Sequence, residues 1–259
     1  MSDNASPSPS APRRSSPWAY GHGTDIGKVR RHNEDAYGLD EELGLFLVAD
    51  GMGGHAAGDV ASRLTVEHVL QAVRAGEPLP EAIAAAHQVV LDAGDQGIGD
   101  PNMGTTVVAL QLWQHQFEVA WVGDSRAYLW DGRHLTQLTH DHSTVQELVD
   151  LGYLSREDAR IHPYAGLLTR SIGIARGERV EVDHVTGVLR REEQILLCSD
   201  GLTTELPDAA IAELLATPGT EQEKVDLLIQ VALEVGGNDN ITAILVSAPD
   251  TAPGQPSLF

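Results

Sequence analysis

The chain has 259 residues and a formal net charge of −21, because 38 acidic residues outweigh 17 basic ones. This acidity disfavours the phosphate backbone of a nucleic acid as a partner. The single cysteine, Cys198, excludes an intrachain disulfide and favours a reducing compartment, so we expect a cytoplasmic protein. No apolar run approaches the roughly 20 residues that span a bilayer, and we expect no membrane partner.

The two ends of the chain differ in composition from the middle. Residues 1–17 are rich in serine and proline, which is typical of a disordered leader. We expect one folded domain over residues 18–248 and a flexible tail over residues 249–259.

Five apolar runs rich in β-branched residues predict strands, and four alanine-rich segments predict helices. The predicted strands are 43–49, 105–112, 117–122, 194–198 and 241–246. The predicted helices are 56–75, 80–93, 207–216 and 221–235. The last helix opens with a capping box, Thr220 with Glu223, and ends at a glycine pair. Capping patterns at Ser143 and Ser155 predict short helices between residues 143 and 161.

The order of these elements indicates the fold class. Two helices follow the first long strand, and strand-like runs separated by short turns come next. This is not a strict alternation of strand and helix. It favours an α+β fold, in which helices cover antiparallel sheets, over a doubly wound parallel sheet.

Three Asp-Gly pairs follow apolar runs, and such a pair between strands usually forms a hairpin turn. Asp131-Gly132 has strand-like sequence on both sides, so we expect a hairpin there. Asp50-Gly51 and Asp200-Gly201 each follow a predicted buried strand but precede a loop and a helix. These two pairs therefore place a carboxylate at the exit of a stiff strand, beside a glycine that lets a ligand approach the backbone.

Two more carboxylates occupy similar places. Asp124 follows a predicted strand, and Asp239 precedes one. Several such carboxylates in one core would repel one another unless cations held them together. Ligands that are all oxygen suit hard ions, Mg²⁺ or Mn²⁺, rather than zinc.

The stretch before the first long strand, "TDIGKVRRHNEDAYG", adds charged residues. If it is extended, Arg30, His32 and Glu34 share one face, with Arg30 and Glu34 about 13 Å apart. Glu34 could then contact a metal cluster while Arg30 binds an anion, because a guanidinium matches a phosphate through paired hydrogen bonds. The alternative, an exposed charged strand, stays open on these residues alone.

Eight segments, in order from Thr24 to Val246, carry a family resemblance. The chain resembles the bacterial branch of the metal-dependent type-2C serine/threonine protein phosphatases. The matching segments are "TDIGKVRRHNED", "VADGMGGHAAGDVAS", "MGTT", "VGDSRAYL", "LTHDHS", "LTRSIG", "LLCSDGL" and "DNITAILV". The resemblance implies a four-layer α/β/β/α sandwich of two antiparallel sheets flanked by helices, with residues 143–168 as a flap beside the site.

The resemblance also implies a role for each strand-end residue. Asp50 would bridge two metal ions, and Asp200 and Asp239 would complete the shell of the first. Glu34 and the Gly51 carbonyl would serve the second ion. Some bacterial relatives bind a third ion near the position of Asp124, a site that Asp200 could share. Arg30 would hold the substrate phosphate.

These roles imply a protein phosphatase that hydrolyses phosphoserine and phosphothreonine. Two ions about 4 Å apart share a bridging water and lower its pKa, and the resulting hydroxide attacks phosphorus in line. The metals and Arg30 neutralise the growing charge. The implied cofactor is Mn²⁺ or Mg²⁺, and the implied partners are phosphoproteins, a serine/threonine kinase or its targets among them. The general acid is unassigned, because Met52 stands where animal relatives have histidine and the role of His55 is open.

Other readings fit the residues less well. A cysteine phosphatase needs arginine six positions after its cysteine, and Thr204 stands there, so we expect Cys198 to be a small buried residue. His140 and His142 make an incomplete zinc site and are interpreted as loop structure. A nucleotide-binding module at the glycine-rich loop 51–58 lacks the P-loop spacing. A catalytically inactive regulator with the same fold is the main alternative.

Overall fold

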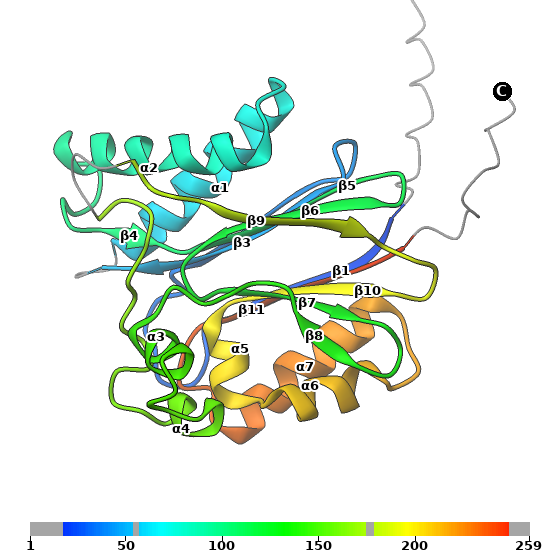
Figure 1. Cartoon of the computed structure of the whole chain (residues 1–259). Helices are drawn as coiled ribbons and strands as arrows, with labels where there is room; N and C mark the ends of the chain where they lie inside the picture. The colour runs from blue at the N-terminus through cyan, green and yellow to red at the C-terminus, as the bar shows by residue number, and fades with distance from the viewer. Residues whose placement is uncertain (1–17, 54–56, 175–178, 249–259) are drawn as a thin grey trace, which may run out of the picture.

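The computed structural model describes residues 18–53, 57–174 and 179–248. Two antiparallel sheets pack face to face, and helices cover the outer face of each (Figure 1). This is the four-layer α/β/β/α arrangement that the sequence predicts. The expected leader and tail, and His55, lie outside the described residues.

The first sheet has five strands, and the strands at its centre are those the sequence predicts. In spatial order they are β1 (Ala19–Asp25), β11 (Ile241–Ser247), β10 (Gln194–Cys198), β7 (Arg126–Trp130) and β8 (Leu135–Gln137). β7 and β8 form the hairpin expected at Asp131-Gly132.

The second sheet is built the same way. Its main path is β2 (Asp35–Asp40), β3 (Leu45–Met52), β5 (Val107–Trp113), β6 (Gln116–Val122) and β9 (Asp183–Val188). A short strand, β4 (Gly104–Thr105), pairs with the end of β3. The strands β1, β2, β7, β8 and β9 were not among the five predicted apolar runs; all of them except β7, which belongs to the predicted hairpin, lie at sheet edges. An edge strand is partly exposed and does not need a continuous apolar run.

The central strands are apolar throughout because both of their faces are buried. In β3, Leu45 and Leu47 pack toward the helices of the second sheet, whereas Phe46 and Val48 pack between the sheets. Successive side chains of a strand point to opposite faces, so one run of residues serves two layers of core. Ile195 and Ile244 of the first sheet meet Phe46 and Val48 across the interface.

Helices α1 (Gly58–Arg74) and α2 (Leu79–Asp95) cover the second sheet, and α5, α6 and α7 cover the first (Figure 1). The bounds of the last three are Asp200–Glu205, Asp208–Leu215 and Glu221–Val235. The capping box at Thr220 and Glu223 is present. The loop expected directly after Asp200 is wrong, since α5 begins at that residue. An acidic residue in the first turn of a helix is favoured by the helix dipole.

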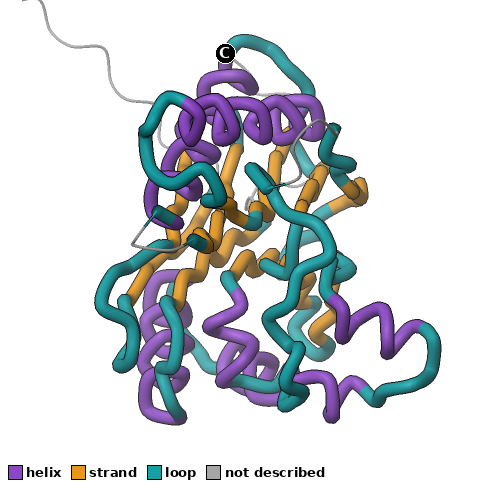
Figure 2. The backbone as a smooth tube through the Cα atoms, turned by 90° about the vertical axis from the view of Figure 1, so that its left-hand side faces the viewer, coloured by secondary structure: helices purple, strands orange, loops and turns teal. Residues whose placement is uncertain are grey.

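The flap, residues 143–168, contains α3 (Thr144–Asp150) and α4 (Arg156–Arg160). Ser143 and Ser155 cap these helices, each accepting a hydrogen bond from a backbone N–H three residues on. A bridge between Ser143 and Leu168 closes the flap at its base. The two short helices project from the body of the molecule (Figure 2).

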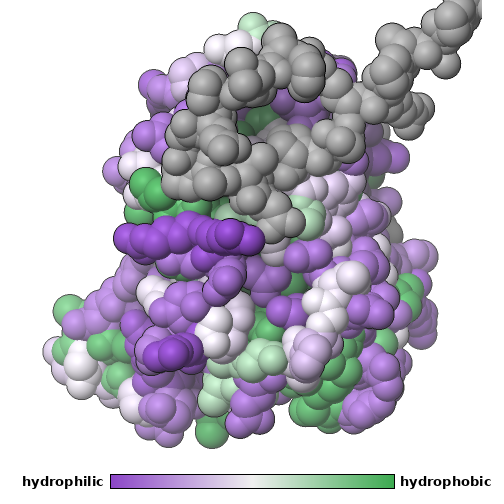
Figure 3. Space-filling model, turned by 90° about the vertical axis from the view of Figure 1, so that its right-hand side faces the viewer, coloured by the Kyte–Doolittle hydropathy of each residue, from purple (hydrophilic) through white to green (hydrophobic). Residues whose placement is uncertain are grey.

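The side of the molecule opposite to that seen in Figure 2 carries many hydrophilic side chains with apolar ones between them (Figure 3). No helix in the described residues combines the length and apolar character needed to cross a bilayer.

Candidate metal centre

Four predicted carboxylates lie at one end of the two sheets, on the side of the flap. Asp50 is near the end of β3, and Asp124 follows β6. Asp200 begins α5, separated by one residue from the end of β10, and Asp239 lies just before β11. The antiparallel registers bring strand ends together within each sheet. In the second sheet, Val107 at the start of β5 pairs with Val122 at the end of β6. In the first sheet, Cys198 at the end of β10 pairs with Ala243 near the start of β11.

The three inner carboxylates strongly affect one another. Burial raises the pKa of Asp50 well above its usual value, and Asp35, Asp200 and Asp124 raise it further. Burial and the charge of Asp200 likewise raise the pKa of Asp124. The side chains of Asp50 and Asp200 lie within hydrogen-bonding reach of each other, and a hydrogen bond between two carboxyl groups needs a proton on one of them. A cluster of this kind needs protons or cations to stay together.

The donor set fits hard divalent cations, because it consists of carboxylate and carbonyl oxygens. Within the described part of the chain, however, no three His, Cys, Asp or Glu side chains already surround a common point as metal ligands would. One reason is visible at Asp239, whose Oδ2 lies 2.6 Å from Nη2 of Arg30. The guanidinium supplies the positive charge next to this carboxylate.

Glu34 and Gly51 lie side by side at the second predicted ion position. The Gly51 N–H donates to the Glu34 carbonyl at 3.1 Å, and Ser62 Oγ donates to the same carbonyl at 2.6 Å. Burial and the charge of Asp59 raise the pKa of Glu34. A Cβ at Gly51 would overlap the backbone oxygens of Gly58 and Glu34, so only glycine fits.

Arg30 does not lie on an extended strand, so the condition on which a common face with Glu34 was predicted is not met. Residues 27–29 form a turn, and the segment from there to Glu34 is irregular. Asn240 holds this segment, donating to the carbonyls of Ile26 and His32 at 2.9 and 3.0 Å. It also accepts from the Glu34 N–H at 2.8 Å. The arginine side chain is 52% exposed at the mouth of the carboxylate cluster.

Several polar residues that support the cluster were not predicted from the sequence. The Asp35 carboxylate is buried and accepts from Ser199 Oγ at 2.8 Å and from Thr242 Oγ1 at 2.6 Å. Burial raises its pKa to about 7. Thr106 exchanges two hydrogen bonds with the backbone of Asp50. Thr106 and Thr242 belong to the family-like segments "MGTT" and "DNITAILV", but neither threonine was predicted to have a role.

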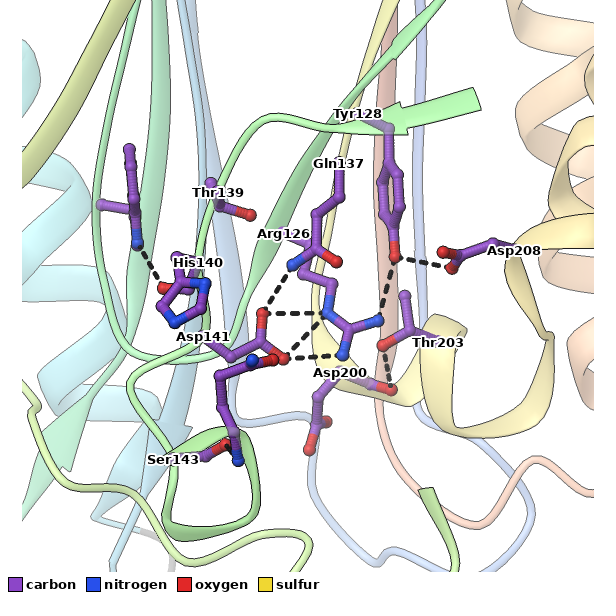
Figure 4. A network of polar contacts seen from close by, with 12 residues as sticks. Arg126, Tyr128, Gln137, Thr139, His140, Asp141, Ser143, Asp200, Thr203 and Asp208 are labelled. Carbon is purple, nitrogen blue, oxygen red and sulfur yellow. Dashed lines mark hydrogen bonds and ion pairs between the residues drawn. The ribbon is translucent and has the colours of Figure 1, made fainter. Parts of the chain in front are cut away.

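A network of polar contacts borders Asp200 on the flap side (Figure 4). Arg126 Nε and Nη2 bind both carboxylate oxygens of Asp141, and its Nη1 donates to Tyr128 Oη at 3.0 Å. A cavity of about 340 Å³ lies here between the flap and the α5–α6 region, and Asp124 and Asp200 line it.

The structure does not support Cys198 as a nucleophile, nor does it support a zinc site at His140 and His142. Cys198 is fully buried, and burial raises the pKa of its thiol to about 12. His140 pairs with Asp150 at 2.8 Å, whereas His142 lies against Gly123 and Asp183. The two histidines thus have separate partners, as expected for loop structure.

Comparisons with known proteins give one consistent result. Residues 23–234 match the family model described as protein phosphatase 2C. The chain is 39% identical over 245 residues to the serine/threonine phosphatase stp of Listeria monocytogenes, covering 90% of this chain and 96% of that protein.

Solved structures agree with this result. The serine/threonine phosphatase PstP/Ppp of Mycobacterium tuberculosis superposes with a TM-score of 0.80 at 34% identity, covering 89% of this chain and 98% of the other. The catalytic domain of the serine threonine protein phosphatase PstP in complex with two manganese ions superposes with a TM-score of 0.80 at 34% identity, covering 90% and 99%. The chain therefore belongs to the bacterial branch of the protein phosphatase 2C family and is a metal-dependent phosphatase.

Proposed function

We propose that the protein hydrolyses phosphoserine and phosphothreonine in phosphoproteins, at a centre of two Mn²⁺ or Mg²⁺ ions with room for a third. The observation that carries this proposal is the close approach of the half-buried carboxylates Asp50 and Asp200 at adjoining strand ends. Two mutually repelling carboxylates held by a rigid fold are the arrangement that divalent cations stabilise.

Asp50 is the proposed bridging ligand because it lies at the centre of the cluster. Its carboxylate interacts with Asp200 and Asp124, whereas Asp200 also interacts with Asp239. We assign Asp200 and Asp239 to the first ion. Glu34 and the Gly51 carbonyl, which adjoin each other, are assigned to the second.

A third ion is assigned to Asp124 and Asp200. Both line the cavity beside the flap, and the charge of Asp200 raises the pKa of Asp124.

Arg30 is the proposed phosphate ligand. It lies at the mouth of the cluster, half exposed, on a segment that Asn240 fixes. With a cation held by Asp239, the guanidinium would be free to bind two oxygens of a phosphate. Arg30 would then orient the phosphoryl group and stabilise the charge that develops on it.

Divalent cations, when bound, would supply the nucleophile by lowering the pKa of a water molecule and would act as Lewis acids on the phosphate. The chain itself holds these ions through rigid strand ends, so the carboxylates need little reorganisation during turnover. The proposed partners are phosphoproteins, a serine/threonine kinase or its targets among them.

The test is phosphate release from a phosphothreonine peptide by protein stripped of metal with EDTA and then supplied with Mn²⁺ or Mg²⁺. We expect turnover only after metal is added, and its loss in Asp50→Asn. Asp226→Asn, an exposed position on α7, serves as the control. A folded protein that binds Mn²⁺ without turnover would instead be the inactive regulator.

A further inference from the structure

Asp141 and His142 are adjacent residues at the entrance to the flap, and both are almost fully buried. Their side chains contact two positions of one neighbouring turn. His142 contacts Gly123, and Asp141 contacts Arg126. The proposed metal ligand Asp124 lies between these two contact points in the chain.

His142 binds both backbone polar atoms of Gly123. Its own N–H donates to the Gly123 carbonyl at 2.9 Å, and its Nδ1 accepts from the Gly123 N–H at 3.0 Å. Gly123 has φ of +108°, a conformation that favours glycine. The imidazole also stacks on Trp121, with ring centroids 6.3 Å apart.

The partners of the imidazole fix its protonation. Because Nδ1 accepts a hydrogen bond, the neutral ring carries its proton on Nε2, which faces Asp183 Oδ2 at 3.3 Å and also lies 3.2 Å from Arg170 Nη1. Arg170 lies beside both and donates to Asp183 Oδ1 at 2.8 Å. Burial and the charge of Arg170 lower the pKa of His142, which keeps the ring neutral and Nδ1 available as an acceptor.

Asp141 holds the other end of the turn through the network of Figure 4. Besides Arg126, it accepts from Gln137 Nε2 at 2.8 Å. Arg126 continues to Tyr128, whose hydroxyl donates to Asp208 Oδ1 at 3.1 Å. The turn is thereby joined to β8 and to the start of α6.

The same two residues stand where the flap begins and ends. The His142 carbonyl accepts from the Thr169 N–H at 2.9 Å, and the bridge between Ser143 and Leu168 follows immediately. The base of the flap and the turn that carries Asp124 are therefore joined through His142.

We propose that His142, together with Asp141, is a positioning residue that holds the flap base and the Asp124 carboxylate in one fixed relation. The key contact is the hydrogen bond from the Gly123 N–H to Nδ1. This inference rests on the proposed role of Asp124 as a metal ligand.

The test measures Mn²⁺ binding directly, by titrating metal-free protein and following free Mn²⁺ by electron paramagnetic resonance. In His142→Leu we expect about tenfold weaker binding of the Mn²⁺ that depends on Asp124, because residues that orient metal ligands typically contribute that much. His142→Asn should restore most of the affinity, because its Oδ1 can accept from the Gly123 N–H. His134→Leu, an exposed histidine in the β7–β8 turn, is the matched control and should bind Mn²⁺ normally.

A double variant separates the two levels of the proposal. Asp124→Ala should weaken Mn²⁺ binding, and His142→Leu should add no further loss in that background. If Asp124→Ala binds Mn²⁺ normally, the ligand role of Asp124 fails, and the inference fails with it. If Asp124→Ala weakens binding but His142→Leu does not, only the positioning role is overturned. Losses that simply add in the double variant would also overturn it, because His142 would then act apart from Asp124.

Discussion

The carboxylate cluster has a more buried half around Asp50 and a more exposed half at Asp239. The two halves differ in which neighbouring groups balance their negative charge. Asp50 is fixed by Thr106 on both sides of its backbone, and its nearest charged neighbours are other carboxylates. Asp239 lies in a short connection before β11, 33% exposed, and forms an ion pair with Arg30. The carboxylates of the buried half therefore repel one another, whereas the carboxylate of the exposed half already has a positively charged partner, Arg30. Under the proposed function, cations would be held by the first half, and in the second they would compete with an arginine for Asp239.

The largest expected effect is that of Asp50→Asn, which alters the buried half. Turnover should fall about 10³-fold or more, because the proposed bridging ligand is lost. The metal-free protein should at the same time become more stable at neutral pH, because one repelling carboxylate is neutral. Phosphate release and thermal denaturation in EDTA check the two effects. A variant with lower thermal stability in EDTA would show that the buried charges are not in conflict.

Asp239→Asn alters the exposed half and should have a smaller effect. We expect a loss of turnover of roughly 10²-fold, because the Asp239 side chain is 33% exposed and the amide oxygen of the asparagine can still contact the ion. The stability of the metal-free protein should change little, since exposed ion pairs contribute about 0–1 kcal/mol. The same two assays apply. A fall in stability as large as that from a core substitution would contradict the comparison.

Arg30→Ala tests whether the arginine passes from Asp239 to the substrate. KM for a phosphopeptide should rise about tenfold with little change in kcat, because phosphate binding is lost and the proposed metal ligands remain. Arg30→Lys should recover only part of the affinity, because an ammonium lacks the paired geometry. Steady-state kinetics at saturating Mn²⁺ measure both parameters. An unchanged KM would show that Arg30 pairs with Asp239 but does not bind the substrate phosphate.

The smallest effect is expected for Cys198→Ala, close in the chain to Asp200 but without a role in the cluster. Turnover should be unchanged, and stability should fall by about 1 kcal/mol from lost packing. Thiol alkylation of the folded wild-type protein should likewise leave activity intact, because the sulfur is buried. Loss of activity in the variant would reopen a thiol mechanism.

The central strands and the longer helices could be predicted because they carry strong local patterns. The runs 194–198 and 241–246 lie within a residue of β10 and β11. The edge strand β9, in which half-buried and exposed residues alternate, has no such run. The hairpin at Asp131-Gly132 was predictable because its turn chemistry is local.

The candidate site was predictable in its carboxylates and not in their supports. An aspartate at the end of an apolar run is visible in the sequence, as at Asp50 and Asp200. Asp35 is hydrogen-bonded by Ser199 and Thr242, which lie 164 and 207 residues away from it in the chain. No local sequence pattern predicts pairs that are so far apart. The turn before Arg30 was missed for the same reason, because Asn240 holds it from the other end of the chain.

The pairing of β1 with β11 has a practical consequence. Ala19 lies opposite Ser247, whereas Asp25 and Ile241 meet at the end of the sheet that carries the carboxylates. Seven residues of strand separate the two ends, about 20 Å at the usual rise. A tag, a fused partner or a solid support joined at Ala19 or Ser247 therefore attaches well away from the entrance used by an incoming phosphoprotein. Capture experiments with bait anchored at either point should leave that entrance open.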